Sequence, residues 1–200
     1  MTVAIQLRRW FGIPREEPTR DADPLIVRLR EGELSAVADA FDRHREEVYA
    51  FARRLVGDDA AAEDLVQEVF LALPAAAMRF RGDASLRTLL ISMAINHARN
   101  HVRAATRRRR AMESVALEPM HRAEPDPEDA SRRRQLAAAL TRALDALPLE
   151  QRVAFVLCEV EERTSAEAAE LLVVPEGTVR TRLFHARRKL RERLEAEGIR

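Results

Sequence analysis

Apolar residues recur at spacings of three and four through most of this chain, as they do in amphipathic helices. The pattern over residues 175–194 separates two chemistries by helical phase. One face is an apolar stripe that must be buried, made of Val179, Leu183, Ala186, Leu190 and Leu194. The other face carries Arg180, Thr181, Phe184, His185 and Arg188. This helix is expected to pack with one face and reach outward with the other.

A shorter helix is expected just before it. Thr164 and Glu167 have the spacing of a capping box, which predicts a helix over residues 165–172, and Pro175 ends it by restricting the residue before it. A short helix, a tight turn and a basic helix make the helix-turn-helix arrangement, whose second helix lies in the DNA major groove. An ordinary helical hairpin with a solvated basic face is the competing interpretation.

Three further helices are expected in residues 24–103. Gly57 ends the first as a C-cap, Asp58 or Asp59 caps the second, and Ser85 is a plausible cap for the third. Their apolar positions predict a core from Leu34, Val37, Ala38, Phe41, Val48, Ala52, Leu55, Leu65, Val66, Val69, Phe70, Leu73, Leu86, Leu89, Leu90, Met93, Ala94 and His97. These three helices form a first domain.

The rest of the chain completes an all-α prediction of two small helical domains joined by a flexible linker. Residues 1–23 show no period and are expected to be a loose leader. Residues 104–131 are rich in proline and acids, as linkers are. Residues 132–200 hold four helices, the helix-turn-helix among them. In the first domain, Pro74 is expected to end or kink the second helix, because proline lacks the N–H that the helix needs.

Composition supports the helical class and a cytoplasmic location. Hydrophobic residues make up 46% of the chain and aromatic residues 4%, so the cores must be built mainly from Ala, Leu and Val. The single cysteine, Cys158, lies in an apolar run and is expected to be buried. It can form no disulfide within the chain, which suits a reducing cytoplasm. No run approaches the roughly 20 apolar residues of a membrane span.

Charge is segregated along the chain, although the net charge is +1. Basic blocks lie at 99–110 and 180–193, and an acidic block lies at 58–68. Such a chain can attract nucleic acid with two surfaces and a basic protein with a third. Within the acidic block, Asp64 and Glu68 share an exposed helix face with a glutamine, although acids on such a face are usually just solvated.

Two polar groups follow the acidic block. Phe80 lies in a loop before a helix N-terminus, where it could stack on an unstacked base or be tucked into the core. Asn96 and Arg99 lie further along that helix, where they could read base edges and neutralise phosphate. His97 and His101 are four residues apart and could bind a metal, but no third ligand is obvious.

Together these motifs resemble bacterial sigma factors of the extracytoplasmic-function (ECF) group, the minimal members of the sigma-70 family. The likeness runs from about Pro24 to Leu194. The segments that carry it are EDLVQEVF at 63–70, the loop at 80–88, LPLEQR at 147–152 and GTVRTR at 177–182. The first two resemble the family's region 2 and the loop after it, and the last two resemble region 4.

The resemblance implies partners and contacts. The positions that grip the β′ clamp coiled coil of core RNA polymerase correspond to Asp64, Gln67 and Glu68. Those that capture the minus-10 strand of promoter DNA correspond to Phe80, Gly82, Asp83, Ala84, Ser85, Leu86, Asn96, Arg99 and Asn100. Those that read the minus-35 element correspond to Thr178, Arg180, Thr181, Arg182, Phe184, His185 and Arg188. The β flap and an anti-sigma factor, which could hold the chain at the inner membrane face, are further implied partners.

Some positions depart from the family pattern. Pro74 and Leu89 stand where the family often has Trp, and Val173 stands where its turn usually has Gly. His185 stands where Arg is frequent. Neutral imidazole cannot make the bidentate guanine contact of Arg, which is worth about 1–3 kcal/mol.

The sequence therefore predicts a dissociable specificity subunit of bacterial RNA polymerase that recognises two promoter elements and helps open the duplex. Neither a catalytic residue nor a cofactor or metal is expected, because no nucleophile–base pair, phosphate loop or metal set is present. One alternative is a free-standing helix-turn-helix regulator whose first domain senses a ligand. Another is a helical enzyme acting on nucleic acid, with His97 and His101 holding a metal.

Overall fold

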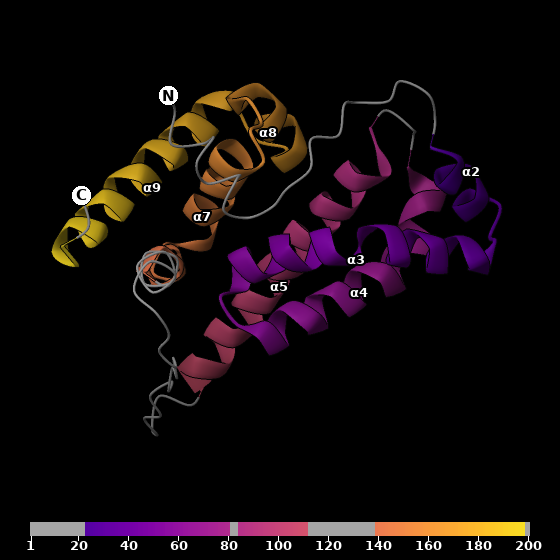
Figure 1. Cartoon of the computed structure of the whole chain (residues 1–200), viewed down its shortest axis with the longest axis horizontal. Coiled ribbons are helices and arrows are strands. Elements are labelled where there is room, and N and C mark those ends of the chain that lie inside the picture. The colour runs from indigo at the N-terminus through magenta and orange to yellow at the C-terminus, as the bar shows by residue number, and fades with distance from the viewer. Residues whose placement is uncertain (1–22, 81–83, 112–138, 199–200) are drawn as a thin grey trace, which may run out of the picture.

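The computed structural model describes residues 23–80, 84–111 and 139–198, with backbone only over 103–111. Every regular element in these ranges is helical, which confirms the predicted all-α class (Figure 1). The elements are α2 (Pro24–Arg30), α3 (Leu34–Val56), α4 (Asp59–Arg79), α5 (Leu86–Ala111), a helical stretch at 139–145, α7 (Leu149–Phe155), the π-helical η1 (Val156–Val160), α8 (Ser165–Leu172) and α9 (Glu176–Ala196). The leader before residue 23, Gly82, Asp83 and most of the predicted linker lie outside the described residues.

Helices α3 and α4 form an antiparallel hairpin whose turn follows the predicted chemistry. Gly57 ends α3 in the left-handed conformation, with φ of 77°. Asp58, rather than Asp59, caps α4, and its carboxylate accepts a hydrogen bond of 2.8 Å from the Ala61 N–H. The rings of Phe41 and Phe70 meet edge to face across the hairpin, with centroids 5.0 Å apart.

The start of the hairpin differs from the prediction. The pattern from Pro24 onward breaks at residues 31–33, so α2 is a separate helix. Leu34 is 81% exposed and Ala38 is exposed, whereas Ala36 and Ala40 are fully buried. The predicted core positions Leu34 and Ala38 were therefore wrong, whereas Val37 and Phe41 do pack against the core. The small residues at 36 and 40 let neighbouring helices approach, and α2 contacts both α3 and α4. From Val48 onward the predicted positions are buried.

Pro74 does not end α4, which continues to Arg79. Leu73 and Ala77, on either side of the proline, are fully buried. The packing of α4 around Pro74 therefore offsets the loss of the backbone hydrogen bond that a proline cannot donate.

Helix α5 is packed from two sides. Ser85 Oγ accepts a hydrogen bond from the Thr88 N–H, as a capping residue does. The helix contacts α3 and α4 and also α7 and α8, so consecutive positions such as Leu90 and Ile91 are both buried. His97 was expected in the core, but it is partly exposed and its imidazole contacts the carboxylate of Glu68 on α4. The helix also extends through Ala111, eight residues into the predicted linker.

The helix-turn-helix agrees closely with its prediction. Both hydrogen bonds of the capping box between Thr164 and Glu167 are present, and α8 covers 165–172. Val173 then takes the left-handed conformation, with φ of 54°. In α9 the predicted stripe is buried from Val179 through Leu190, and Leu194 is half-buried.

One hydrophobic core joins the two halves of the chain, here called the N-terminal half (residues 23–111) and the C-terminal half (residues 139–198). It contains buried residues of α2 to α5 together with residues of α7, η1, α8 and the start of α9. A smaller core lies under α9 and contains Leu144, Phe155 and Leu183 among others. None of the described helices combines the length and apolar character that crossing a membrane requires.

Candidate polymerase and nucleic-acid interfaces

The acidic face of α4 is exposed, as predicted. Asp64, Gln67 and Glu68 point to solvent because Leu65 and Val69 turn the opposite face into the core. Glu68 is not isolated, because its carboxylate lies 2.8 Å from Nδ1 of His97 on α5. The arrangement gives α4 a negative, accessible surface at its N-terminal end.

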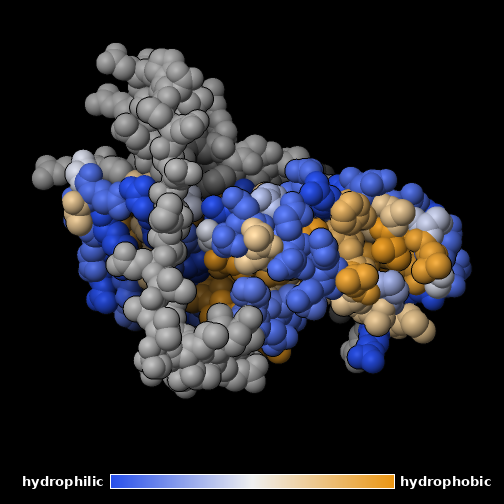
Figure 2. All heavy atoms as spheres, turned by 90° about the horizontal axis from the view of Figure 1, so that it is seen from below, coloured by the Kyte–Doolittle hydropathy of each residue, from blue (hydrophilic) through white to orange (hydrophobic). Residues whose placement is uncertain are grey.

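The same exposed face continues as an apolar surface that the sequence reasoning missed. Leu71 is 82% exposed and Met78 is 72% exposed, and they follow Glu68 at helical spacing. Leu34 lies at the corresponding end of the hairpin. Figure 2 shows hydrophobic residues gathered at the end of the molecule that holds α2 and the open end of the hairpin. Exposed apolar patches are typical of protein-binding surfaces.

Only some of the residues assigned to the minus-10 element are exposed in the structure. Asn96 and Asn100 are exposed on α5, and Ala84 and Ser85 are partly exposed before it. Leu86 is 1% exposed, so its side chain is part of the core. Phe80 is half-buried and packs against the same core, which is the second of its two interpretations.

Arg99 is turned toward the C-terminal half. Its Nε and Nη2 donate hydrogen bonds of 2.9 Å and 3.2 Å to the two carboxylate oxygens of Glu150, on the first turn of α7. Its Nη1 also donates to the amide oxygen of Asn96 at 3.4 Å. In this conformation the guanidinium is therefore occupied within the protein.

The outer face of α9 brings most of the residues assigned to the minus-35 element together. Arg180, Thr181 and Arg188 are exposed, and Phe184 is 62% exposed with its ring edge-on to that of His185. The polar neighbours of Arg180, Thr181 and Arg188 lie on the same helix. They are Arg180 to Glu176 at 2.6 Å, Thr181 to the Gly177 carbonyl at 2.9 Å, and Arg188 to Glu192 at 3.7 Å.

Two residues of this set lie away from that outer face. Thr178, in the first turn of α9, is half-buried. Arg182 points inward, and its Nη1 lies 2.8 Å from Glu150 Oε2. The helix therefore presents a basic and aromatic surface from which Arg182 is withdrawn.

A buried charge cluster between the two halves was not predicted. It consists of Glu161, Arg54, Arg87 and Glu47, in which Arg87 donates to both carboxylates and Arg54 lies 3.8 Å from Glu161. The Glu161 side chain is 2% exposed. Burial is the main cause that lowers the pKa of Arg54. Local sequence patterns carry no signal for this cluster, because Arg87 and Glu161 are 74 positions apart.

The described residues contain neither a group that could bind a metal ion nor an activated thiol. Those residues contain no group of three or more His, Cys, Asp or Glu side chains that could hold a metal ion. Cys158 is half-buried, and burial, with the nearby Glu159, raises the pKa of its thiol to about 11. The thiol is therefore neutral near pH 7 and packs as an apolar group.

Both halves of the chain match models of known protein families. The family model for Sigma-70 region 2 matches residues 40–108, and that for Sigma-70 region 4 matches residues 137–190. The chain is 31% identical over 179 residues to the RNA polymerase sigma-H factor of Pseudomonas aeruginosa, covering 86% of this chain and 92% of that one. It is 29% identical to the ECF RNA polymerase sigma-E factor of Escherichia coli K12, covering 86% and 93%.

Two solved structures share the fold. The sigma factor RpoE in complex with the anti-sigma factor NepR, from Bartonella quintana, is 25% identical and has a TM-score of 0.59, covering 84% of this chain and 98% of that one. CnrH in complex with the cytosolic domain of CnrY is 24% identical and has the same TM-score, covering 88% and 99%.

An all-helical chain with a region 2 half and a region 4 half that carries a helix-turn-helix is a transcription initiation factor of the bacterial type. Such proteins confer promoter specificity and catalyse no reaction themselves. This chain belongs to the extracytoplasmic-function group of the sigma-70 family and is an RNA polymerase sigma factor.

Proposed function

We propose that this sigma factor grips core RNA polymerase with the acidic face of α4, recognises minus-35 and minus-10 elements, and helps to open the duplex. In this proposal residues 24–103 act as the region 2-like domain and residues 132–200 as the region 4-like domain, joined by residues 104–131, of which 104–111 continue α5. The observation that carries it is the exposed row of Asp64, Gln67 and Glu68 in the part of the chain that matches region 2.

The acidic row suits the β′ clamp coiled coil as its partner. Two carboxylates and an amide are exposed on one helix face, with the imidazole of His97 beside Glu68. A basic helix of the partner can approach along this row, and complementary charge increases the rate and the specificity of association. In the second half, the region 4-like domain would contact the β flap.

The test reverses charge on this face. Asp64→Lys with Glu68→Lys should weaken binding to core polymerase by about 2 kcal/mol or more, roughly thirtyfold, because like charges would then meet. Binding is measured by fluorescence anisotropy of the labelled full chain titrated with core polymerase. Circular dichroism checks that the helical content is unchanged.

The matched control reverses two acids elsewhere in the N-terminal half. Asp42 and Glu46 are exposed on α3 and are four residues apart, as Asp64 and Glu68 are on α4. Asp42→Lys with Glu46→Lys changes the net charge equally and should leave polymerase affinity close to that of the parent. Equal affinities for the two double variants would contradict the assignment of the grip.

The two DNA-binding surfaces are proposed to act together. On α5 the exposed Asn96 and Asn100 would contact the minus-10 strand, and the loop around Gly82 and Asp83 would hold it melted. On α9 the exposed Arg180 and Phe184 would face the minus-35 element. Initiation that depends on core polymerase supports this proposal, whereas tight duplex binding without initiation would favour a free-standing regulator.

An anti-sigma factor is the proposed regulator. A relative of similar length, with 25% identity, is known in complex with one. The lone, half-buried thiol is consistent with a cytoplasmic protein. A membrane-bound anti-sigma partner would hold the chain at the inner membrane face, and co-purification from a lysate of the native host is the measurement that would identify it.

A further inference from the structure

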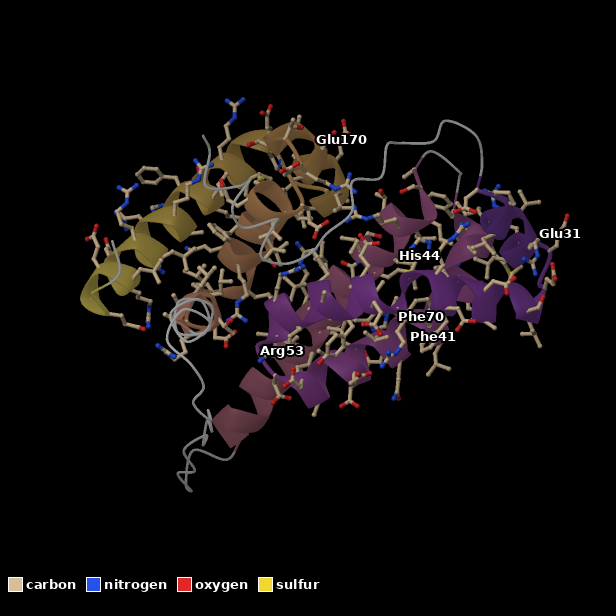
Figure 3. All side chains as sticks on the ribbon, viewed as in Figure 1. Glu31, Phe41, His44, Arg53, Phe70 and Glu170 are labelled. Carbon is tan, nitrogen blue, oxygen red and sulfur yellow. The ribbon has the colours of Figure 1, made fainter. Side chains whose placement is uncertain are left out.

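The exposed face of α4 becomes apolar after the acidic row. Leu71 and Met78 are 82% and 72% exposed, and Ala75, between them, is also exposed. Their spacings of four and three residues place them on one side of the helix, here called the apolar patch (Leu71, Ala75 and Met78). Phe70, by contrast, turns inward to meet Phe41 between α3 and α4 (Figure 3). The patch is therefore an apolar surface that the described helices leave open.

The chain enters the fold beside this patch. Asp23 Oδ2, just before α2, lies 3.4 Å from Arg43 Nη1 on α3. At the other end of α2, Arg30 Nε donates a hydrogen bond of 3.4 Å to the Ala77 carbonyl, one residue before Met78. Figure 1 shows α2 against the open end of the hairpin of α3 and α4. The preceding segment is thus tethered at the end of the molecule that holds the patch.

The segment before α2 is complementary to this face in composition. Residues 3–13 read VAIQLRRWFGI, with six large apolar residues, two arginines and no acidic residue. Arg8 and Arg9 directly precede Trp10 and Phe11. On α4 the apolar patch directly follows the acidic row, so the face offers carboxylates beside apolar side chains. Apolar groups next to guanidinium groups match both parts of this face.

The connecting chain is long enough for the segment to reach the patch. Ten residues, 14–23, join residues 3–13 to α2. A chain of that length can span roughly 33 Å. Residues 71 and 78 are only about 10 Å apart along α4, because an α-helix rises by about 1.5 Å per residue. Tethering also raises the effective concentration of the segment at the patch, so that a contact of modest intrinsic affinity is populated within one chain.

We infer that residues 3–13 dock on the apolar patch of α4 in the free chain, with Trp10 and Phe11 covering Leu71 and Met78. The arginines at positions 8 and 9 then lie toward the acidic row. The patch is thus a binding site for a segment of the same chain. The inference concerns the chain without polymerase and does not depend on which partner uses the acidic row.

Trp10 makes the test direct, because it is the single tryptophan of the chain. Its emission spectrum and its quenching by acrylamide, a neutral quencher, are measured on the full chain. In the parent, docking should give an emission maximum at shorter wavelength than in the urea-unfolded chain, and a quenching constant several-fold lower. Quenching as strong in the folded chain as in the unfolded chain would overturn the inference.

Two matched double variants locate the contact. Leu71→Gln with Met78→Gln makes the patch polar and should raise the quenching constant several-fold. Val173→Gln with Phe184→Gln makes the same kind of change in the helix-turn-helix, at side chains that are 89% and 62% exposed, and should leave Trp10 protected. Circular dichroism checks that both variants keep the helical content of the parent. Equal quenching in the two double variants would overturn the assignment to α4.

A variant in the segment tests the same contact without changing any residue of the helices. Ile5→Gln with Leu7→Gln should raise the quenching of Trp10 in the parent. It should add little in the chain that already carries Leu71→Gln and Met78→Gln, because the contact that it weakens is already lost. Fully additive effects of the two pairs would contradict a shared contact and overturn the inference.

A dilution series separates docking within one chain from contact between two copies. Intrachain docking gives a protection of Trp10 that does not change with protein concentration. Protection that is lost on dilution would show that a second copy supplies the segment, and would overturn the inference. Core polymerase takes no part in these measurements, so a failure of the proposed function would leave their outcome unaffected.

Discussion

Gly57 shows how one residue connects local geometry to the packing of the whole chain. Its position after α3 requires a left-handed conformation, and the absence of a side chain lets Asp145 approach. The first requirement is readable from the sequence, because a glycine that follows an amphipathic run is a typical C-cap. The second is not, since Asp145 lies in the other half of the chain.

We predict that Gly57→Ala lowers the free energy of unfolding by more than Gly32→Ala does. Each substitution costs roughly 1–2 kcal/mol for placing a Cβ in the left-handed region. Only the change at Gly57 adds a clash, with Asp145 Oδ1 2.2 Å away, whereas the methyl group at Gly32 meets open space. Urea unfolding followed by circular dichroism measures both, and equal losses would show that Asp145 gives way freely.

At the scale of elements, α8 could be predicted to the residue because its signals are local. The capping box at Thr164 sets the start, and the step before Pro175 sets the end. The start of α3 could not, because the face it buries is chosen by α2 and α4. Pro74 shows the same limit, since tertiary packing keeps α4 helical through a residue that disfavours a helix.

The recognition helix α9 carries a prediction of its own. Arg180→Ala with His185→Ala should reduce promoter-specific initiation and change the preferred minus-35 sequence, because the outward face of α9 loses its base-reading groups. One good bidentate contact is worth about 1–3 kcal/mol of discrimination. The measurement is abortive initiation by the holoenzyme on a series of promoters mutated in the minus-35 element.

The control for this prediction lies on the same helix. Arg191 and Arg193 are exposed near the end of α9, outside the residues assigned to the minus-35 element. Arg191→Ala with Arg193→Ala removes at least as much positive charge and should leave the sequence preference as it is. An unchanged preference in the Arg180 and His185 variant would count against base reading by this face.

At the scale of the whole molecule, we predict that holoenzyme binding to promoter DNA weakens with salt. Each neutralised duplex phosphate adds about 0.9 to the log–log slope. Arg188 is exposed on α9, so Arg188→Ala should reduce that slope by about this amount if it contacts a phosphate. The slope comes from dissociation constants measured over a salt series, and a flat dependence would argue against phosphate contacts.

The sequence predicted the all-α class, the family and the exposed acidic and basic helix faces, because each depends on short-range spacing. The packing of one half on the other depends on pairs such as Arg152 with Leu55, which are 97 positions apart. Neither periodicity nor charge segregation identifies such pairs. The same holds for Arg99 and Arg182, whose types suggested DNA contact while the fold turns both toward Glu150.

The shared core has a consequence for how partner affinity is measured. A partner that binds only the separated halves acts on the fraction of molecules that are open, so its apparent Kd equals the intrinsic value divided by that fraction. Arg87 and Arg152 each contact the other half of the chain. Substituting either would then change the apparent affinity for polymerase without altering a polymerase contact. Sequence differences in the residues buried between the halves could thus set how readily related sigma factors compete for the same core enzyme.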